Sequence, residues 1–269
     1  MNSDELRRLQ LTELELLIDF DNYCKKHGLR YYLIGGALLG AERYNHFIPW
    51  DDDIDVAMPR EDYELFQQIW KKDAMTKYFL QSSKTDPLFA RGILKLRIKG
   101  THIIEESCKN IKFLNDGIYI DIFPIDFVDE NKGKKMEMKG KKIRFLATMK
   151  TIKSGYDNKR FRYIKKIISI FLKLVPTSYL DNKLEKICTE ENSKKRKYAV
   201  LFLHNYGWKK QIHLASIFEE GSTCIFEGHI FCAPKNKEAF LLKVFGSDYL
   251  VEPPKELQKQ PHKYIEIKF

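Results

Sequence analysis

The sequence predicts an α+β fold, with a mixed β-sheet core flanked by helices and a largely helical C-terminal part. Two observations predict it. Up to about residue 130, short runs with strand-like alternation are interleaved with longer runs of helical spacing. Beyond residue 130, helical patterns dominate to about His204. A chain of 269 residues can bury a sizeable core, and we expect a catalytic core in residues 1–130 and a mostly helical, basic region with a C-terminal segment in residues 131–269.

The first expected element is a helix over residues 4–26. Leucines recur at near-helical spacing, Ser3 is the expected N-cap, and Gly28 follows as a stop signal. A strand at 30–34 then runs into the pair Gly35-Gly36. The expected order continues with a short helix at 37–44, a loop at 45–52, a strand at 53–57 and a helix from Pro59 to about Lys71.

Two further strands complete the expected core. Residues 93–98 alternate between apolar and basic, which is typical of a half-exposed strand, and residues 117–123 form a strand that Pro124 ends. The helical patterns that follow are broken near Ser154-Gly155 and Pro176. A mixed segment comes last, with a strand-like run at 223–226 and a helix at 238–244.

The composition is that of a soluble globular protein. No run of eighteen apolar residues occurs, and the N-terminus lacks the basic-then-apolar order of a signal peptide. The five cysteines are scattered without C-x-x-C spacing, which favours reduced thiols over disulfides or a zinc site. We therefore expect a cytoplasmic location.

Positive charge is concentrated between Asn131 and Lys173, where 15 Lys and Arg stand against two acidic residues. Such a region attracts anions. Within it, residues 161–175 carry an apolar stripe among basic residues. Such a helix either contacts the inner face of an anionic membrane or packs into the core with a solvated basic back, and we favour the core helix. No nucleic-acid-binding motif is present, so no nucleic acid partner is expected.

The pattern Asp51-Asp52-Asp53-Ile54-Asp55-Val56 predicts a metal site. In a strand, Asp53 and Asp55 share one face, and Asp51 extends the row if the strand begins early. Crowded carboxylates repel one another, and a divalent cation removes the repulsion. Mg²⁺ fits best, and two ions can clamp the attacking and leaving oxygens of a displacement. The alternation with Ile and Val argues against an exposed acidic turn or a calcium loop.

Asp121 is the natural third carboxylate, because an unpaired charge between Ile120 and Ile122 would be costly. It either completes the metal site or takes a proton from an incoming hydroxyl. The alternative is a structural acid bonded to backbone amides.

Other residues are candidates for substrate binding. Gly35 and Gly36 let backbone N–H groups approach a phosphate closely. Trp50 either holds a quaternary ammonium group against its ring or packs the loop onto the core. Lys95 and Arg97 share a strand face and either meet diphosphate oxygens or lie on a solvated edge strand.

A glycine pair after a strand, an Asp-hydrophobic-Asp strand and a later Asp together resemble the nucleotidyltransferase fold. Here 16 residues separate Gly36 from Asp53, more than in many members. Longer stretches of the sequence resemble the LicD family of phosphocholine transferases, which is related to the fukutin proteins. The matching stretches are Gly35–Ala41, Phe47–Val56, Met58–Tyr63, Lys95–Arg97 with Thr101, Asp121–Asp126, Phe226–Gly228, Pro234 and Phe245–Tyr249, with Phe245 where Tyr is usual.

This resemblance implies transfer of phosphocholine from CDP-choline to a sugar hydroxyl of a cell-surface glycan, such as lipopolysaccharide or teichoic acid, on an acceptor that is lipid-linked in some cases. By position, Asp51, Asp53 and Asp55 would be metal ligands and Asp121 a further acidic partner. Two alternatives stay open. One is a nucleotidyltransferase that uses an NTP and releases pyrophosphate, and the other is a non-catalytic nucleotide- or glycan-binding module.

Overall fold

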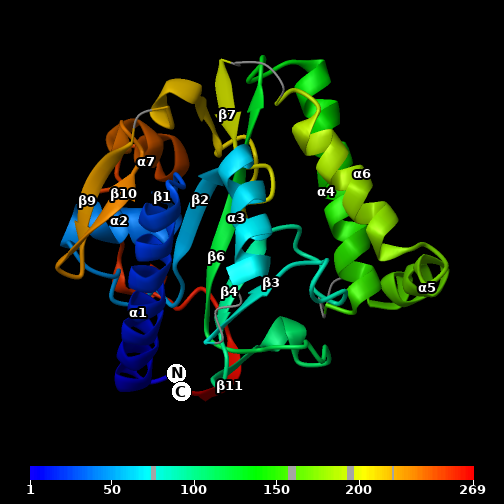
Figure 1. Cartoon of the computed structure of the whole chain (residues 1–269), viewed down its shortest axis with the longest axis horizontal. Coiled ribbons are helices and arrows are strands. Elements are labelled where there is room, and N and C mark those ends of the chain that lie inside the picture. The colour runs from blue at the N-terminus through cyan, green and yellow to red at the C-terminus, as the bar shows by residue number, and fades with distance from the viewer. Residues whose placement is uncertain (74–76, 157–161, 193–196, 220) are drawn as a thin grey trace.

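The computed structural model describes residues 1–73, 77–156, 162–192, 197–219 and 221–269. In these ranges, seven strands form one mixed sheet (Figure 1). Its order is β1 (Tyr32–Leu33), β2 (Asp55–Pro59), β6 (Tyr119–Val128), β4 (Leu94–Ile98) and β3 (Tyr78–Gln81), with β7 (Tyr198–Val200) on the far end of β6 and β8 (Ile212–Leu214) beside β7. Only β2 and β6 pair in parallel among these described strands. The α+β prediction is confirmed.

Two helices, α1 (Ser3–His27) and α3 (Arg60–Asp73), lie against the sheet and against each other. Their contact is aromatic: Phe20 and Tyr23 of α1 meet Phe66 edge-on, and Tyr23 also meets Trp70. These side chains belong to the main apolar core, which α2 (Gly35–Tyr44) and α7 (Lys237–Phe245) also join. This core fixes the parallel strands β2 and β6 in place.

Several predicted boundaries were wrong for local reasons. The N-cap of α1 is Asn2, not Ser3, because Asn2 and Glu5 form a reciprocal capping box. Helix α2 begins at Gly35 rather than residue 37, so both glycines lie in its first turn. Strand β2 covers 55–59 rather than 53–57, which leaves Asp53 before the strand.

The strand that was expected to end at Pro124 continues to Val128. Pro124 is placed opposite Met58 of the parallel neighbour β2 and does not interrupt the pairing. The longer strand pairs through 126–128 with β7, in a stretch that was predicted to be helical. The expectation of a half-exposed strand at 93–98 was also wrong, because β4 is an interior strand between β6 and β3, with Lys95 and Arg97 both buried.

The helical part contains α4 (Lys134–Ser154), α5 (Arg162–Leu172) and α6 (Thr177–Thr189), which lie together to one side of the sheet (Figure 1). A second apolar cluster joins α4 and α6 to Val128, Val200 and Trp208. The predicted stripe begins at residue 161, outside the described residues. Its later members Ile167, Phe171 and Leu174 are exposed, so the expectation of a core helix was wrong. In the described part of the chain, no helix is long and apolar enough to cross a membrane.

Two small strand pairs complete the structure. The hairpin of β9 (Ser222–Phe226) and β10 (His229–Ala233) turns at Glu227-Gly228, where both residues have positive φ. Strand β11 (Tyr264–Lys268) pairs antiparallel with β5 (His102–Glu105). The last strand therefore lies beside the first helix, close to the N-terminus (Figure 1). Short 3-10 turns occur at Glu106–Cys108, Ala215–Ile217 and Lys255–Leu257.

Candidate active site

The two strands of the parallel pair bring Asp55 and Asp121 opposite each other. They are direct partners in the register of β2 and β6, so their side chains leave the sheet on the same face. The amide of Asp121 donates to the carbonyl oxygen of Ile54 at 2.9 Å, which fixes the register at this point. Two carboxylates separated by 66 positions in the chain thus lie side by side at the start of strand β2.

The glycine pair lies directly against these carboxylates. A Cβ atom on Gly36 would overlap an oxygen of Asp51, and a Cβ atom on Gly35 would lie 2.8 Å from an oxygen of Asp55. Gly35 also has a φ of 59°, a conformation that side chains rarely adopt. Helix α2 has no side-chain cap at its N-terminus, so its first N–H groups face this region. The glycines are therefore needed for the close approach of the acids to the helix start.

Burial and mutual repulsion raise the pKa values of these acids. Burial, followed by the charges of Asp52 and Asp55, raises the pKa of Asp51 to about 7. Burial, followed by Asp55 and Asp51, raises the pKa of Asp53 well above its ordinary value. Carboxylates in this state either take up protons or need a cation, and a set of hard oxygen donors suits Mg²⁺. The four acids Asp51, Asp53, Asp55 and Asp121, which we call the acid cluster, therefore offer the hard oxygen donors that Mg²⁺ prefers. Among the described residues, however, the ligand atoms that lie within 4.8 Å of one another are those of Asp52, Asp53 and His262.

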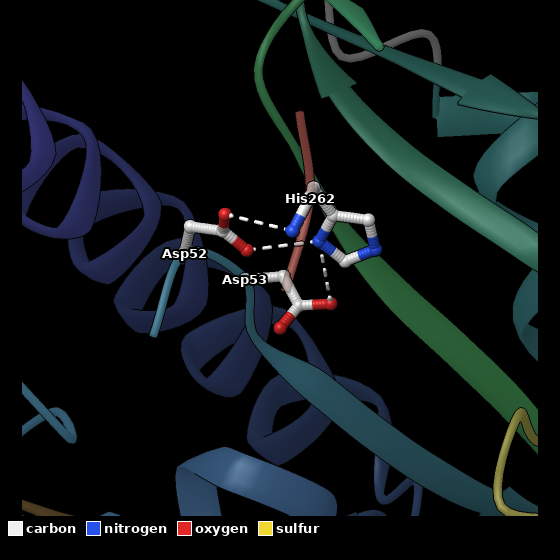
Figure 2. Close-up of side chains that lie close together, drawn as sticks. All are labelled: Asp52, Asp53 and His262. Carbon is white, nitrogen blue, oxygen red and sulfur yellow. Dashed lines mark hydrogen bonds and ion pairs between the residues drawn. The ribbon is translucent and has the colours of Figure 1, made fainter. Parts of the chain in front are cut away.

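Asp53 reaches the cluster differently from the prediction. Asp53 precedes β2, so the alternation of side chains along a strand does not determine its position. A contact with His262 of the C-terminal segment holds its side chain instead. Figure 2 shows Asp52, Asp53 and His262 together: His262 Nδ1 lies 2.8 Å from Asp52 Oδ1 and 3.8 Å from Asp53 Oδ2. The backbone N–H of His262 also donates to Asp52 at 3.2 Å. These three form a group close enough to hold an ion.

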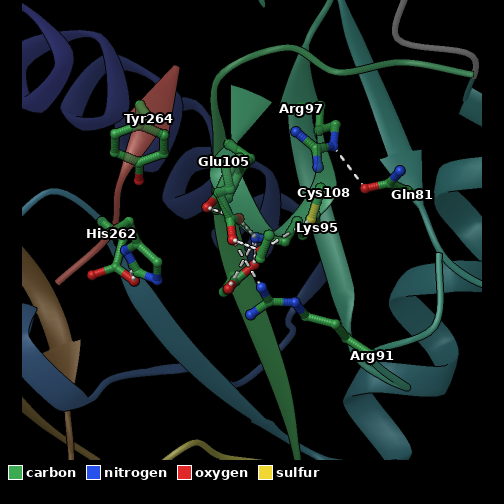
Figure 3. A network of polar contacts seen from close by, with 12 residues as sticks. Gln81, Arg91, Lys95, Arg97, Glu105, Cys108, His262 and Tyr264 are labelled. Carbon is green, nitrogen blue, oxygen red and sulfur yellow. Dashed lines mark hydrogen bonds and ion pairs between the residues drawn. The ribbon is translucent and has the colours of Figure 1, made fainter. Parts of the chain in front are cut away.

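Lys95 is the cation nearest Asp121. Its Nζ lies 2.9 Å from Asp121 Oδ1, 3.9 Å from Glu105 Oε1 and 3.1 Å from the centre of the Tyr119 ring. Burial lowers the pKa of Lys95, although Asp121 and Glu105 oppose the shift. Burial would raise the pKa of Glu105, but Arg91 and Lys95 hold it below its ordinary value. Figure 3 shows this network beside His262 and Tyr264.

Arg97 lies further from the acids than Lys95 does. Its Nε donates to Gln81 at 2.7 Å and its Nη1 donates to the carbonyl oxygen of Gly117 at 2.6 Å (Figure 3). The side chain is buried, with its guanidinium 4.7 Å from the Tyr119 ring centre. The structure therefore places Lys95 at the acid cluster and directs Arg97 towards neighbouring strands.

Trp50 lines a cavity of about 590 Å³ beside the acidic loop. Arg7, Gln10, Phe47 and Glu227 lie around it. Glu227 binds Arg7 at 2.7 Å and accepts from the backbone N–H of Phe47 at 3.2 Å, while Gln10 donates to the carbonyl oxygen of Asp51 at 2.9 Å. The hairpin and α1 thus hold the loop that carries Trp50.

Sequence patterns missed three residues at the acid cluster. His204 Nε2 lies 3.3 Å from Asp55 Oδ2, with its ring between Phe123 and Tyr206. His262 comes from the C-terminal segment. Glu13 of α1 is buried, and burial together with Asp52 and Asp51 raises its pKa well above the ordinary value. No local spacing could reveal them, because each is far from the acids in the chain.

The chain is similar to several known proteins. Residues 28–153 match the nucleotidyltransferase domain described as LicD/FKTN/FKRP. The chain is 29% identical over 264 residues to the lipopolysaccharide cholinephosphotransferase LicD of Haemophilus influenzae, covering 96% of both chains. A stretch of 42 residues is 48% identical to the ribitol 5-phosphate transferase FKRP of human and of mouse, covering 16% of this chain and 8% of each relative.

Residues 28–153, which include the glycine pair, the carboxylate row and strands β1, β2, β3, β4 and β6 of the mixed sheet, therefore match a nucleotidyltransferase-type domain. Within that class, the chain carries a LicD-family domain, and the resemblance noted in its sequence, including the relation to the fukutin proteins, is confirmed.

Proposed function

We propose that this protein is a metal-dependent phosphotransferase acting on glycans. It moves phosphocholine, or a similar phosphoryl-alcohol group, from a CDP-linked donor to a sugar hydroxyl of a cell-surface glycan such as lipopolysaccharide or teichoic acid. The single observation that carries the chemistry is the meeting of Asp55 and Asp121 on parallel strands beside Gly35-Gly36. The activities of the relatives, on lipopolysaccharide and with ribitol 5-phosphate, support the substrate class.

The proposed cofactor is Mg²⁺, with two ions expected. Asp51, Asp53, Asp55 and Asp121 would hold it, because they are acids that crowd together at the start of β2. When bound, Mg²⁺ would neutralise charge on the phosphate oxygens of the donor. Groups of the protein itself would bind and orient the phosphate. The N–H groups at the start of α2 lie where a phosphate can approach, since neither glycine carries a side chain.

The proposed reaction is an in-line displacement at phosphorus. The oxygen of the acceptor hydroxyl forms the new bond to the phosphoryl group, and the bond to the CMP oxygen breaks, so CMP leaves. The hydroxyl proton passes to a carboxylate of the cluster, and Asp121 is our candidate. Lys95, 2.9 Å from Asp121, favours the ionised form of this carboxylate, which is the form that can accept the proton. Holding both reactants against one fixed face contributes most of the acceleration.

Trp50 is the proposed contact for the alcohol part of the donor. A quaternary ammonium group against an indole ring is worth about 2 kcal/mol when desolvated. In Trp50→Ala we therefore expect the KM for CDP-choline to rise about tenfold with kcat much less affected. An unchanged KM would remove Trp50 from the donor site.

The decisive test is to identify the nucleotide product. The purified protein is incubated with Mg²⁺, CDP-choline and candidate glycan acceptors, and in parallel with NTPs. Release of CMP with phosphocholine on the glycan supports the proposal. Pyrophosphate from an NTP would instead support a nucleotidyltransferase, and binding of CDP-choline without any turnover would support a binding module. Asp55→Asn is the matched inactive variant, expected to lose at least about 10³-fold in kcat.

A further inference from the structure

We infer that the exposed face of α5 and the turn after it form a docking surface for an anionic lipid bilayer. We call this surface the α5 face and define it by Ile167, Ile170, Phe171 and Leu174. The inference goes beyond the proposed transfer reaction and does not depend on it.

The α5 face is apolar, contiguous and unpacked. The four residues recur at i, i+3, i+4 and i+7, which places them on one side of a helix. Their exposed fractions are 58%, 58%, 69% and 85%. The opposite side of the helix is anchored, since Leu172 is buried and its carbonyl oxygen accepts from Lys153 Nζ of α4 at 2.8 Å. The helix is therefore held by α4 with its apolar side turned outwards.

The charge around the α5 face favours an anionic partner. No acidic residue occurs between Asp157 and Asp181, whereas six Lys and Arg do. Lys173, one turn beyond Ile170, is exposed. On α4, whose C-terminal end is joined to α5 through Lys153, the exposed Lys141, Lys142 and Arg144 add to the positive charge of the helical part. An apolar helix face within a basic region is the combination that lies at the interface of anionic membranes.

A bilayer explains these features better than a protein partner does. A second copy of the chain would bring the same excess of positive charge to the contact, and the two surfaces would repel. A bilayer offers an apolar interior to the four side chains and anionic headgroups to the lysines at the same time. Among the described helices none crosses a membrane, so the contact would be peripheral. It would also place the enzyme next to any acceptor that is attached to a lipid.

The test is sedimentation of the full-length protein with lipid vesicles. One set contains phosphatidylcholine alone, and the other contains about a quarter phosphatidylglycerol. We expect the wild type to sediment with the anionic vesicles, and binding to fall in high salt. In Ile170→Glu/Phe171→Glu we expect binding to drop at least about tenfold, because two apolar side chains that would enter the bilayer are replaced by negative charges. Both residues are exposed, so the melting temperature should hardly change.

A matched control is Leu250→Glu/Val251→Glu, which makes the same charge change at two exposed apolar residues elsewhere on the chain. This variant should bind vesicles almost like the wild type. Wild-type protein left in the supernatant, or equal loss of binding in both variants, would overturn the inference. A dimer in light scattering that the α5 variant abolishes, without vesicle binding, would instead make the face a contact between copies. The vesicles contain no acceptor, so these results are independent of turnover.

Discussion

At the scale of single residues, the acid cluster lowers the stability of the folded protein in the absence of a cation and favours the binding of one. Asp53 lies among the carboxylates of Asp51, Asp52, Asp55 and Asp121, and its pKa is raised by burial and by those neighbours. In the absence of a cation, this arrangement costs folding free energy, because either repulsion persists or protons must be bound. A cation that binds the folded state alone recovers that free energy. The cluster should therefore be visible in stability measurements as well as in turnover.

Asp53→Asn tests this view. Without Mg²⁺ we expect a melting temperature equal to or above that of the wild type, since an amide relieves the repulsion. Mg²⁺ at about 100 times its Kd should stabilise the wild type by about 2.7 kcal/mol and the variant far less. Thermal melting with and without Mg²⁺ measures both, and the exposed Asp248→Asn is the control. A variant stabilised as strongly as the wild type would show that Asp53 is not a ligand.

Gly36→Ala tests the close approach of the acids to α2. A Cβ atom there would overlap Asp51, so we expect activity to fall at least about tenfold while the protein stays folded. Gly228→Ala is the matched control, because it strains a φ of 76° but meets no atom within 4 Å. It should cost about 1 kcal/mol of stability and leave activity unchanged. Equal activities in the two variants would argue against a steric role for Gly36.

At the scale of elements, the C-terminal segment acts on the acidic loop from outside the family domain. Strand β11 is held by β5. His262, two residues before it, contacts the side chain of Asp52 through its backbone and ring, and Tyr264, the first residue of β11, donates its hydroxyl to the carbonyl oxygen of Asp52. The loop itself has no strand pairing until Asp55. Its geometry therefore depends on a segment more than 200 positions away.

His262→Ala tests this dependence. Residues that orient metal ligands typically contribute about 10–100-fold in metal affinity or activity, so we expect the apparent Kd for Mg²⁺ to rise by that factor. Activity measured over a series of Mg²⁺ concentrations gives the value. His229→Ala, at an exposed position of the hairpin, should behave like the wild type. Parallel Mg²⁺ curves for both variants would leave the segment with a structural role only.

Which elements the sequence could predict depended on how local their signals are. The existence of helix α1 and of strand β2 follows from leucine spacing and from Asp alternating with Ile and Val, although the start of β2 was predicted two residues too early. Strand β3 and the pairing of β5 with β11 were missed, because their pairing is decided by distant partners. Lys95 and Arg97 gave the pattern of a half-exposed strand, yet both are buried, because Asp121, Gln81 and Tyr119 compensate their charges.

At the scale of the whole molecule, two apolar clusters share one strand. In β7, Ala199 belongs to the main core while Val200 belongs to the cluster formed with α4 and α6. Leu203 packs against both clusters. Strand β6 extends from the acid cluster at Asp121 to Val128 of the second cluster. We therefore expect the two clusters to unfold together, although the predicted boundary near residue 130 lies between them.

Leu184→Ala tests the coupling. This buried side chain of α6 lies only in the second cluster, and its truncation should cost about 2–5 kcal/mol. Trp208 reports on the second cluster and Trp70 on the main core. If the clusters are coupled, fluorescence and circular dichroism will give one coincident transition in urea, shifted to lower midpoint in the variant. Exposed Leu242→Ala is the control, and two separated transitions would instead support two domains.

The two ends of the chain lie side by side. Gln260 Nε2 donates to the carbonyl oxygen of Met1 at 3.2 Å, and Arg8 lies 4.1 Å from the centre of the Phe269 ring (Figure 1). For protein engineering, a short peptide linker could join these ends and new ends could be opened in an exposed turn such as 228. A polyhistidine purification tag is a poor choice at either end, because its imidazoles would compete with the carboxylates for added metal.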